Sequence, residues 1–424
     1  MIPLLFITFF ALLFLGVPIA FALGISSTLY LLLADIPLVT LPIKMYSGID
    51  VFVLLSIPGF ILAGNLMNAC GMTDRIIRFS NHLLGHVRGG LGLANIGSSM
   101  VFAGISGTAV ADTASIGSIM IPAMKKEGYD APFACAVTAS SSTIGPIIPP
   151  SMPMIVAGSL TGLSIGKLFL AGAIPGLLLA LGFMIVSYLI SKKQGHPVHP
   201  RSSARQATRG FIDAFWALAM SALILFGIVG GIFTPTEASI VAVLYAFLVG
   251  GLFYRTLTWS SIVKVMQDSA SSTASLMLLV GFANLFGWIL VSEQIPQAIA
   301  NSLLSLTDNP IVLLLLINLL LLVVGSFMET LAALLILYPI LLKVGEAAGI
   351  DPIQFSVMVV LNLIIGLNTP PVGVCLFVAS EIGQTPVSKI ARAGLPFLAV
   401  SLSVLALVSY VPEISLFLPD LLSK

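Results

Sequence analysis

The chain has 424 residues, of which 58% are hydrophobic and 8% are charged. A soluble domain carries about 25% charged residues, so this composition excludes a soluble globular protein of this length. The formal net charge of +1 leaves no basic face for a nucleic-acid partner. The composition therefore predicts an all-α polytopic protein embedded in a lipid bilayer.

The first apolar stretch, 3–33, lies in a segment that begins MIPLLFITFFALLFLGVPIAFALG. It has no basic segment before it and no small-residue cleavage site, so we expect a retained first span and not a cleaved signal peptide. The next apolar stretch, 51–70, is followed by GMTDRIIRFSNHLLGHVRGG (71–90), whose arginines lie among Ile and Leu. Residues 71–90 are therefore predicted to form an interfacial helix.

The remaining apolar stretches are 91–123, 131–160, 166–190, 211–230, 238–253, 270–292, 311–342, 352–380 and 394–411. A span needs about 20 residues, so we expect about nine to eleven crossings. Two stretches, 91–123 and 311–342, are too long for one crossing and are rich in Gly, Ser and Thr near their middles, at AGISGTAVADTAS and VGSFMETLAA. They are predicted to be re-entrant hairpins, which is possible only where irregular backbone is buried in protein or lines a cavity.

Two proline-rich segments interrupt apolar stretches that are long enough to be helices. GPIIPP (145–150) lies within 131–160, and GLNTPP (366–371) lies within 352–380. Proline removes an amide donor and crowds the preceding turn, so both stretches are predicted to be discontinuous helices. An opened helix exposes carbonyl oxygens and helix ends, which suit a small hard cation such as Na⁺.

The two halves of the chain repeat each other at a shift of 221 residues. The residues matched are mainly Gly and Pro, which set backbone geometry. The matched pairs are Gly104 with Gly325, Gly128 with Gly349, Asp130 with Asp351, Gly145 with Gly366, Pro149 with Pro370, Pro150 with Pro371, Gly162 with Gly383 and Pro175 with Pro396. The pattern predicts a first repeat at 1–190 and a second at 211–424.

The charge of the connecting segments predicts that the repeats are inverted. The linker SKKQGHPVHPRSSARQATRG (191–210) is strongly basic and is predicted to be cytoplasmic. Residues 71–90 carry three arginines, whereas their counterpart at 293–310 carries no Lys or Arg. Chance variation in loop charge is the alternative explanation.

Each hairpin tip is predicted to meet a broken helix and to enclose a cation with it. Main-chain oxygens of the first site would come from Ser106, Gly145, Ile148 and Pro150, and those of the second from Gly325, Gly366 and Thr369. Asp112 is predicted to be an ion or proton ligand, with a structural hydrogen bond as the alternative. Residues expected to contact substrate are Ser141, Ser142, Thr143, Glu329 and Asn368. Alternatively, the Gly and Pro residues only set kinks for helix packing.

The other polar residues of the apolar stretches have simpler interpretations. Asp130 and Asp351 precede helices and are expected to be caps, and Glu237 is consistent with a first helical turn. The three cysteines, Cys70, Cys135 and Cys375, are expected to be buried. GISG (104–107) and Tyr129-Asp130 match fragments of intramembrane protease motifs, but no His is placed beside Ser106 and no GxGD partner exists, so we expect no enzyme activity.

Three segments, GISGTAVADTAS, SSTIGPIIPPSMPM and GLNTPPVGVCLF, resemble the large membrane subunit of tripartite ATP-independent periplasmic (TRAP) transporters, and most of all its sialic-acid branch. The resemblance covers essentially the whole chain. It implies an elevator-type, Na⁺-coupled symporter in the bacterial inner membrane. It also implies two partners, a small four-helix membrane subunit and a periplasmic substrate-binding protein that delivers an organic acid. Glu329 stands where some relatives carry Asp.

The sequence therefore predicts the transport subunit of a Na⁺-driven importer of an organic acid, of the sialic acid or C4-dicarboxylate type. Three alternatives remain open at this point. The chain could be a stand-alone Na⁺/dicarboxylate symporter, a structural subunit without transport activity, or a channel.

Overall fold

The computed structural model describes residues 2–198, 200, 203–295, 298, 309–370 and 372–422, without the side chains of 14, 104–106 and 204. Across these residues the chain is helical and contains no strand, which confirms the predicted all-α class. Eight of the described helices are long and apolar enough to cross a membrane, and several shorter apolar helices accompany them.

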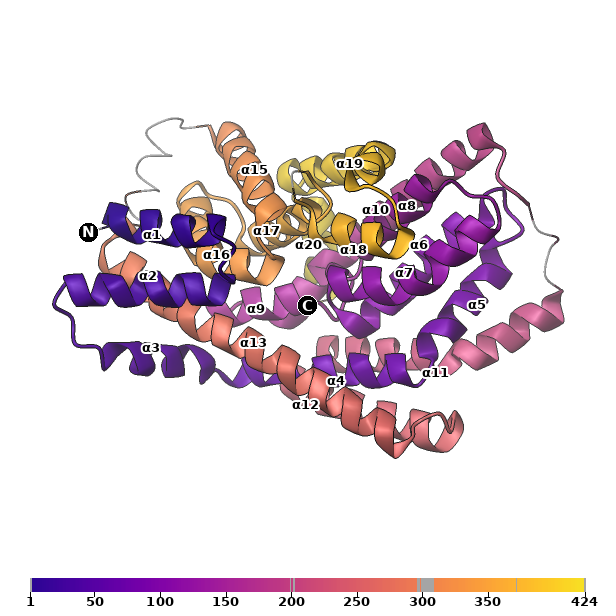
Figure 1. Cartoon of the computed structure of the whole chain (residues 1–424), viewed down its shortest axis with the longest axis horizontal. Helices are drawn as coiled ribbons and strands as arrows, with labels where there is room; N and C mark the ends of the chain where they lie inside the picture. The colour runs from indigo at the N-terminus through magenta and orange to yellow at the C-terminus, as the bar shows by residue number, and fades with distance from the viewer. Residues whose placement is uncertain are drawn as a thin grey trace.

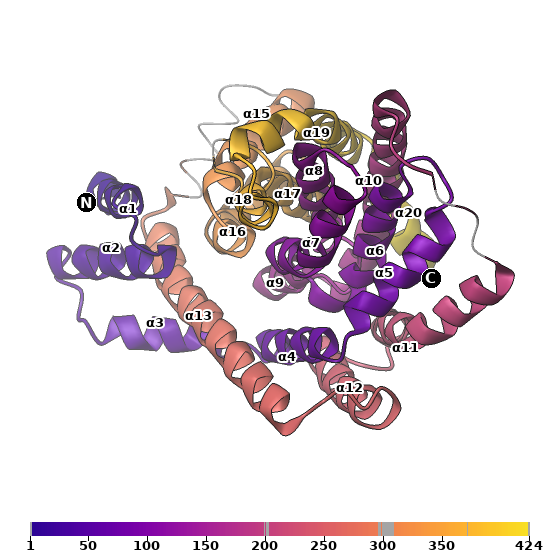
Figure 2. The ribbon, with the colours of Figure 1, turned by 45° about the vertical axis from the view of Figure 1, so that its right-hand side comes forward.

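The helices form two groups, which we call the frame and the core (Figures 1 and 2). The frame consists of α1 (Ile2–Phe14), α2 (Ile19–Leu33), α3 (Thr40–Ile49), η1 (Phe52–Leu55), α4 (Ser56–Ala69), α11 (Ala204–Val229), α12 (Pro235–Leu248), the π-helical turn η2 (Val249–Phe253) and α13 (Trp259–Ser292). The core consists of α6 (Gly90–Ser106), α7 (Ala109–Lys126), α8 (Ala131–Ser142), α9 (Met152–Thr161), α10 (Ile165–Gln194), α15 (Pro310–Phe327), α16 (Thr330–Ala347), α17 (Pro352–Gly366), α18 (Val374–Gly383) and α19 (Val387–Tyr410). Helix α5 (Met72–Leu84) packs on α6 and α11, and α20 (Glu413–Leu422) packs on α10.

The frame is organised around α13, a helix of 34 residues that runs along one side of the core (Figure 1). It contacts α2, α3 and α4, and small or polar side chains set these crossings. A Cβ atom on Gly24 would lie 2.7 Å from a ring carbon of Phe282, so glycine is needed for α2 to approach. Asn284 Nδ2 donates to the carbonyl oxygen of Lys44 at 2.7 Å, and Asn65 Nδ2 donates to Ser269 Oγ at 2.9 Å.

The first predicted span was wrong, because the chain folds there into two packed helices, α1 and α2. The break lies at Gly16, whose φ of 81° is a left-handed conformation, and at Pro18, which precedes α2. Gly tolerates that φ at no steric cost, and Pro cannot continue a helix from the preceding turn. Neither helix alone is long enough to cross the bilayer.

The basic linker is also more helical than the sequence suggested. Helix α10 continues to Gln194 and ends at Gly195, which has a φ of 74°. Helix α11 already begins at Ala204, after a capping box in which Ser203 and Gln206 satisfy each other's backbone amides. Caps of this kind fix where a helix starts.

The core shows the 221-residue repeat in its helix boundaries. The shift maps both ends of α7, Ala109 and Lys126, onto both ends of α16, Thr330 and Ala347. It maps the last residue of α6 onto the last residue of α15. The two predicted hairpins, α6–α7 and α15–α16, are therefore observed, as are the two broken helices, α8–α9 and α17–α18. The predicted inversion of the repeats relative to the membrane stays a prediction.

The two repeats exchange the second halves of their broken helices. Helix α9 packs on α16 and α17, and the repeat-related α18 packs on α7 and α8. At one end of α18, Lys125 Nζ donates to the carbonyl oxygen of Gly383 at 2.9 Å. Close packing is again set by glycine, because a Cβ on Gly383 would lie 2.1 Å from Cys135 Sγ. All three cysteines are buried, as predicted.

A buried histidine, His196, lies at one end of the core. His196 follows α10, is only 6% exposed, and stacks on Tyr129 with ring centroids 4.2 Å apart. Its Nδ1 lies 3.0 Å from Ser191 Oγ. Loss of hydration on burial lowers the pKa of His196 below its ordinary 6.5, although the negative charge of Asp130 acts in the opposite direction.

We therefore predict an acid-sensitive component of stability at His196. Its folded-state pKa is lowered, so its stabilising contribution is complete above pH 6.5 and is lost as pH falls from 6.5 towards the folded-state pKa. The melting temperature of the detergent-solubilised chain should fall between pH 7.5 and pH 5.5, with a loss of at most about 1.4 kcal/mol per pH unit from this group. His196→Gln, which can still hydrogen-bond to Ser191, should reduce that fall, whereas the control His86→Gln should not. An unchanged pH profile in His196→Gln would contradict the prediction.

Candidate functional site

The first opening lies where the α6–α7 tip meets the break between α8 and α9. Gly107, with a φ of 63°, turns the chain between α6 and α7. Helix α8 ends at Ser142, and α9 starts only after Ser151, whose Oγ accepts from the amide of Met154 at 3.2 Å. A Cβ on Gly107 would lie 3.4 Å from the carbonyl oxygen of Pro150, so the tip backbone borders the broken segment.

The broken segment presents main-chain oxygens without internal partners. The amides of Thr143 and Ile144 still donate to carbonyls three residues earlier, at 3.1 Å and 3.0 Å. Among the described residues, however, no donor reaches the carbonyl oxygens of Gly145, Ile148 or Pro150. An oxygen in that condition inside a membrane protein is costly unless something else binds it.

Asp112 lies directly against this segment. It is fully buried in the first turn of α7, where the helix dipole favours a negative charge. A Cβ built on Gly145 would lie 2.1 Å from Asp112 Oδ2, so the carboxyl group occupies the space that glycine leaves open. The first opening thus places a carboxyl oxygen next to the predicted carbonyl ligands. Oxygen donors of this kind fit a hard cation such as Na⁺. The backbone of Ser106 lies at the end of α6, and its side chain is outside the described part of the structure.

The second opening is held together by its backbone. A Cβ on Gly366 would lie 2.3 Å from the carbonyl carbon of Gly325, so these two glycines make direct main-chain contact. The amide of Gly373 donates to the carbonyl oxygen of Ser326 at 3.2 Å. The carbonyl oxygen of Gly366 accepts from the amide of Thr369 at 2.9 Å, whereas no described residue donates to the carbonyl oxygen of Gly145 in the first opening.

Glu329 performs a capping role in the structure. It is the N-cap of α16, and its Oε2 accepts from the amides of Leu331 at 2.9 Å and Ala332 at 3.2 Å. The 221-residue shift places it on Thr108, the N-cap of α7. Asp351 likewise caps α17, as predicted, and Glu237 lies in a capping box at the start of α12. Asp130 occupies an N-cap position but makes no side-chain capping bond.

The predicted substrate residues of the first repeat lie inside the core. Ser141 and Ser142 are 0% exposed and Thr143 is 2% exposed. Ser142 Oγ donates to the carbonyl oxygen of Thr138 at 2.8 Å. Ser141 Oγ belongs to a buried polar network with Ser99 Oγ, 2.9 Å away, and Asn95. These hydroxyl groups serve the packing of α8 in the structure.

Asn368 connects the two repeats. Its Nδ2 donates to the carbonyl oxygen of Ala139 in α8 at 2.8 Å, while its Oδ1 is buried and accepts no hydrogen bond from the described residues. The start of α18 is also close to both openings. Cys375 of α18 is fully buried close to Thr113, Asp112 and Glu329.

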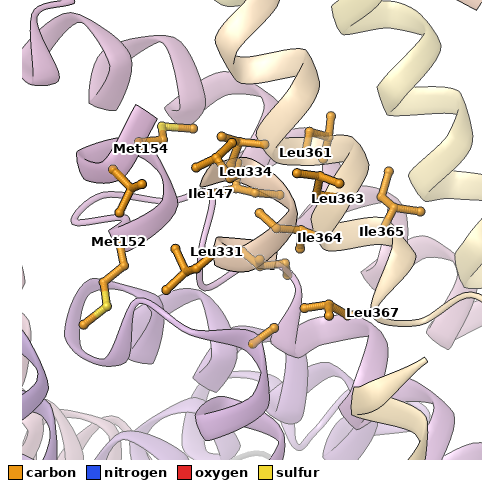
Figure 3. Close-up of a cluster of buried hydrophobic side chains, with 14 of the residues drawn as sticks. Ile147, Met152, Met154, Leu331, Leu334, Leu361, Leu363, Ile364, Ile365 and Leu367 are labelled. Atoms are coloured by element: carbon orange, nitrogen blue, oxygen red, sulfur yellow. The ribbon is translucent and has the colours of Figure 1, made fainter. Parts of the chain in front are cut away.

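Apolar side chains fill the space between the first break and the second repeat (Figure 3). In this view Ile147, Met152 and Met154 face Leu331 and Leu334 of α16. Ile147, Leu334 and Leu363 are 0% exposed. This packing separates the two openings from each other and excludes water between them.

A cavity of about 170 Å³ lies beside the first tip, between frame and core. Its lining residues are Phe60, Ile61, Gly64, Asn65 and Asn68 of α4, Phe102, Thr108, Ala111 and Ser115 of the hairpin, Met152 of α9, and Ser272 and Leu276 of α13. Asn68 Nδ2 donates to Ser115 Oγ at 3.0 Å, and its Oδ1 accepts from Thr73 at 2.9 Å. We did not predict Asn65 and Asn68. The sequence feature that could have indicated them is a pair of side-chain amides three residues apart within an apolar stretch.

Comparison with known proteins identifies the family. A family model described as "Tripartite ATP-independent periplasmic transporter, DctM component" matches residues 6–414. The chain belongs to this TRAP transporter family. It is 44% identical over 411 residues to the sialic acid TRAP transporter large permease protein SiaM of Vibrio cholerae, covering 97% of this chain and 96% of that protein. It is 42% identical over 400 residues to the C4-dicarboxylate TRAP transporter large permease protein DctM of Pseudomonas aeruginosa, covering 94% of each.

The fold is shared with a more distant transporter. The YdaH transporter of Alcanivorax borkumensis superposes with a TM-score of 0.62 at 16% identity, covering 87% of this chain and 86% of that one. The prediction that this chain is a TRAP large membrane subunit is confirmed by the family match. As a TRAP permease with eight candidate spans among its described helices, the chain is a multi-pass protein of the bacterial inner membrane. Its relatives are named as transporter permeases, in line with the predicted lack of enzyme activity.

Glycine should be required at both openings for packing alone. Gly145→Ala and Gly366→Ala place a methyl group 2.1 Å from Asp112 Oδ2 and 2.3 Å from the Gly325 carbonyl carbon, respectively. Overpacking of this kind costs about 1–3 kcal/mol, so both variants should melt at lower temperature in detergent. Gly287→Ala in α13 is the matched control, because no heavy atom lies within 4 Å of its added Cβ. Wild-type melting of Gly366→Ala would show that the two backbones separate at no cost.

Proposed function

We propose that this TRAP permease is the transport subunit of a Na⁺-coupled importer of an organic acid. The observation that carries the proposal is the first opening, where Asp112 lies against Gly145 and the carbonyl oxygens of Gly145, Ile148 and Pro150 have no donor among the described residues. These are hard oxygen ligands beside a negative charge, which is the donor set that an alkali cation requires. The second cation would be bound by Gly325, Gly366 and Thr369.

Cation binding would couple to substrate binding through charge. No Lys or Arg lines the cavity beside the first tip, which instead offers amide and hydroxyl groups from Asn65, Asn68, Thr108, Ser115 and Ser272. A carboxylate substrate there would depend on those donors and on the charge of a nearby Na⁺. Each ligand then raises the affinity for the other, which is a reciprocal binding linkage.

Relatives indicate the substrate class. The Vibrio cholerae relative is named for sialic acid and the Pseudomonas aeruginosa relative for C4-dicarboxylates. Both are carboxylic acids, so an organic acid of the sialic acid or C4-dicarboxylate type is the proposed cargo. The family implies two partners, a small membrane subunit and a periplasmic substrate-binding protein that delivers the acid.

Translocation is proposed to occur by an elevator-type movement of the hairpins and broken helices along the frame. The cavity supports this proposal because its walls come from both groups, α4 and α13 on one side and the hairpin with Met152 on the other. The hydrogen bond between Asn68 and Ser115 joins frame and core across this boundary. Such a movement would break that bond and re-form it in each cycle.

Reconstitution tests the function directly. The chain, a small membrane subunit and candidate binding proteins are placed in proteoliposomes, and uptake of sialic acid and of C4-dicarboxylates is measured with and without an inward Na⁺ gradient. Uptake should require the binding protein and should rise with the gradient. Uptake that is indifferent to Na⁺ would overturn the proposed coupling, and uptake by this chain alone would favour the stand-alone symporter. Fast, uncoupled flux would identify a channel.

Asp112 should set the response to Na⁺. Asp112→Asn keeps the side-chain size but removes the negative charge beside Gly145, so the Na⁺ concentration for half-maximal uptake should rise about 5- to 150-fold. Asp74→Asn, on the exposed face of α5, is the control and should leave that concentration unchanged. If Asp112→Asn responds to Na⁺ as the wild type does, Asp112 has a structural role only.

A further inference from the structure

A basic pocket lies outside the transport site, where α5 crosses the start of α11. It has a volume of about 230 Å³ and is lined by Arg75, Arg78, His82, Gln206, Arg209, Gly210 and Asp213. The two segments that the sequence marked as basic, 71–90 and 191–210, therefore meet at one place (Figure 2). The close crossing depends on Gly210, because a Cβ there would lie 2.9 Å from His82 Cδ2.

Positive charge outnumbers negative charge in this pocket. Three arginines face a single carboxylate, that of Asp213, and none of the three forms an ion pair within the described residues. Arg75 is held in place by structural contacts. Its Nη1 donates to the carbonyl oxygens of Cys70 at 3.1 Å and Gly71 at 2.9 Å, and its guanidinium stacks over Tyr254 at 3.7 Å. Arg78 and Arg209 are exposed; Arg78 Nε donates to the carbonyl oxygen of Asp74 at 3.3 Å, which leaves its two terminal nitrogens for an anion.

Exposed apolar side chains lie on the same two helices as the pocket. Ile212 is 61% exposed and Phe215 is 44% exposed on α11, and Leu83 is 47% exposed on α5. Phe211, also 44% exposed, packs on Phe79 with ring centroids 5.8 Å apart. Helix α5 follows α4 directly and α11 is a candidate span, so the pocket sits at the end of membrane-spanning helices. A basic cleft beside exposed apolar side chains matches a phospholipid, with a charged head group and acyl chains.

We propose that this pocket binds the phosphate of an anionic phospholipid, with Arg78 and Arg209 as its ligands and the acyl chains against Ile212. Arginine suits this role because its guanidinium donates two parallel hydrogen bonds to phosphate oxygens. Arg75 contributes charge but is fixed by its own contacts. The bound lipid joins α5, which packs on the core, to α11 of the frame. This proposal is independent of the Na⁺ coupling proposed above.

The test is a lipid titration of the purified, detergent-solubilised full chain, read by its melting temperature. Phosphatidylglycerol should stabilise the wild type and phosphatidylcholine should not. Arg78→Gln with Arg209→Gln should weaken the apparent affinity for phosphatidylglycerol about 30-fold, from about fivefold per arginine. The double variant should melt as the wild type does in phosphatidylcholine, because both side chains are exposed.

Two controls make the result specific. Lys192→Gln with Lys193→Gln removes the same charge from the exposed end of α10, outside the pocket, and should leave the affinity unchanged. An equal loss of affinity for phosphatidylglycerol in this control would show that binding depends on overall positive charge, and would overturn the proposal that the lipid binds in the pocket. Inorganic phosphate that stabilises as strongly as phosphatidylglycerol would overturn the lipid assignment. An unchanged lipid titration in the arginine variant would overturn the proposal itself, leaving an acidic segment of a partner protein as the occupant to examine.

Discussion

The constraint on which the rest depends is that a backbone carbonyl inside a membrane protein needs a partner. A continuous helix satisfies this need by its own hydrogen bonds. In this chain the helix is interrupted at two places related by the 221-residue shift. At the first, no described residue donates to the carbonyl oxygens of Gly145, Ile148 and Pro150. At the second, main-chain contacts between Gly325 and Gly366 take up much of the space. The two openings are related in topology but differ in how completely the protein itself closes them.

The exchange of α9 and α18 between the repeats explains how such openings remain ordered. Each half-helix is packed against the other repeat's hairpin, so neither break is a free end. Lys125, donating to Gly383, and Asn368, donating to Ala139, add hydrogen bonds across the same boundary. Helix α18 begins close to both Asp112 and Glu329.

The frame and the core differ in how they are built. Core helices such as α8 and α17 are buried nearly all round, whereas the frame exposes large apolar side chains such as Phe226 and Ile232 to its surroundings. The cavity between the two groups has amide and hydroxyl groups among apolar side chains, and Met152 borders both this cavity and the apolar cluster of Figure 3. The open side of the site therefore faces the boundary between frame and core. The basic pocket at α5 and α11 lies at an edge of the same boundary.

The sequence by itself determined the helical class, the two hairpins, the two breaks and their repeat, because Gly and Pro restrict backbone geometry locally and lipid forbids other solutions. It also indicated Asp112, since a carboxyl group in an apolar stretch is costly. The tertiary structure alone decided which polar groups line open space. Ser141 and Ser142 prove to be buried hydroxyls and Glu329 a helix cap, while Asn68 borders the cavity. The physical reason is that exposure depends on which helices pack together, and the packing partners of α9 and α18 lie about half a chain away.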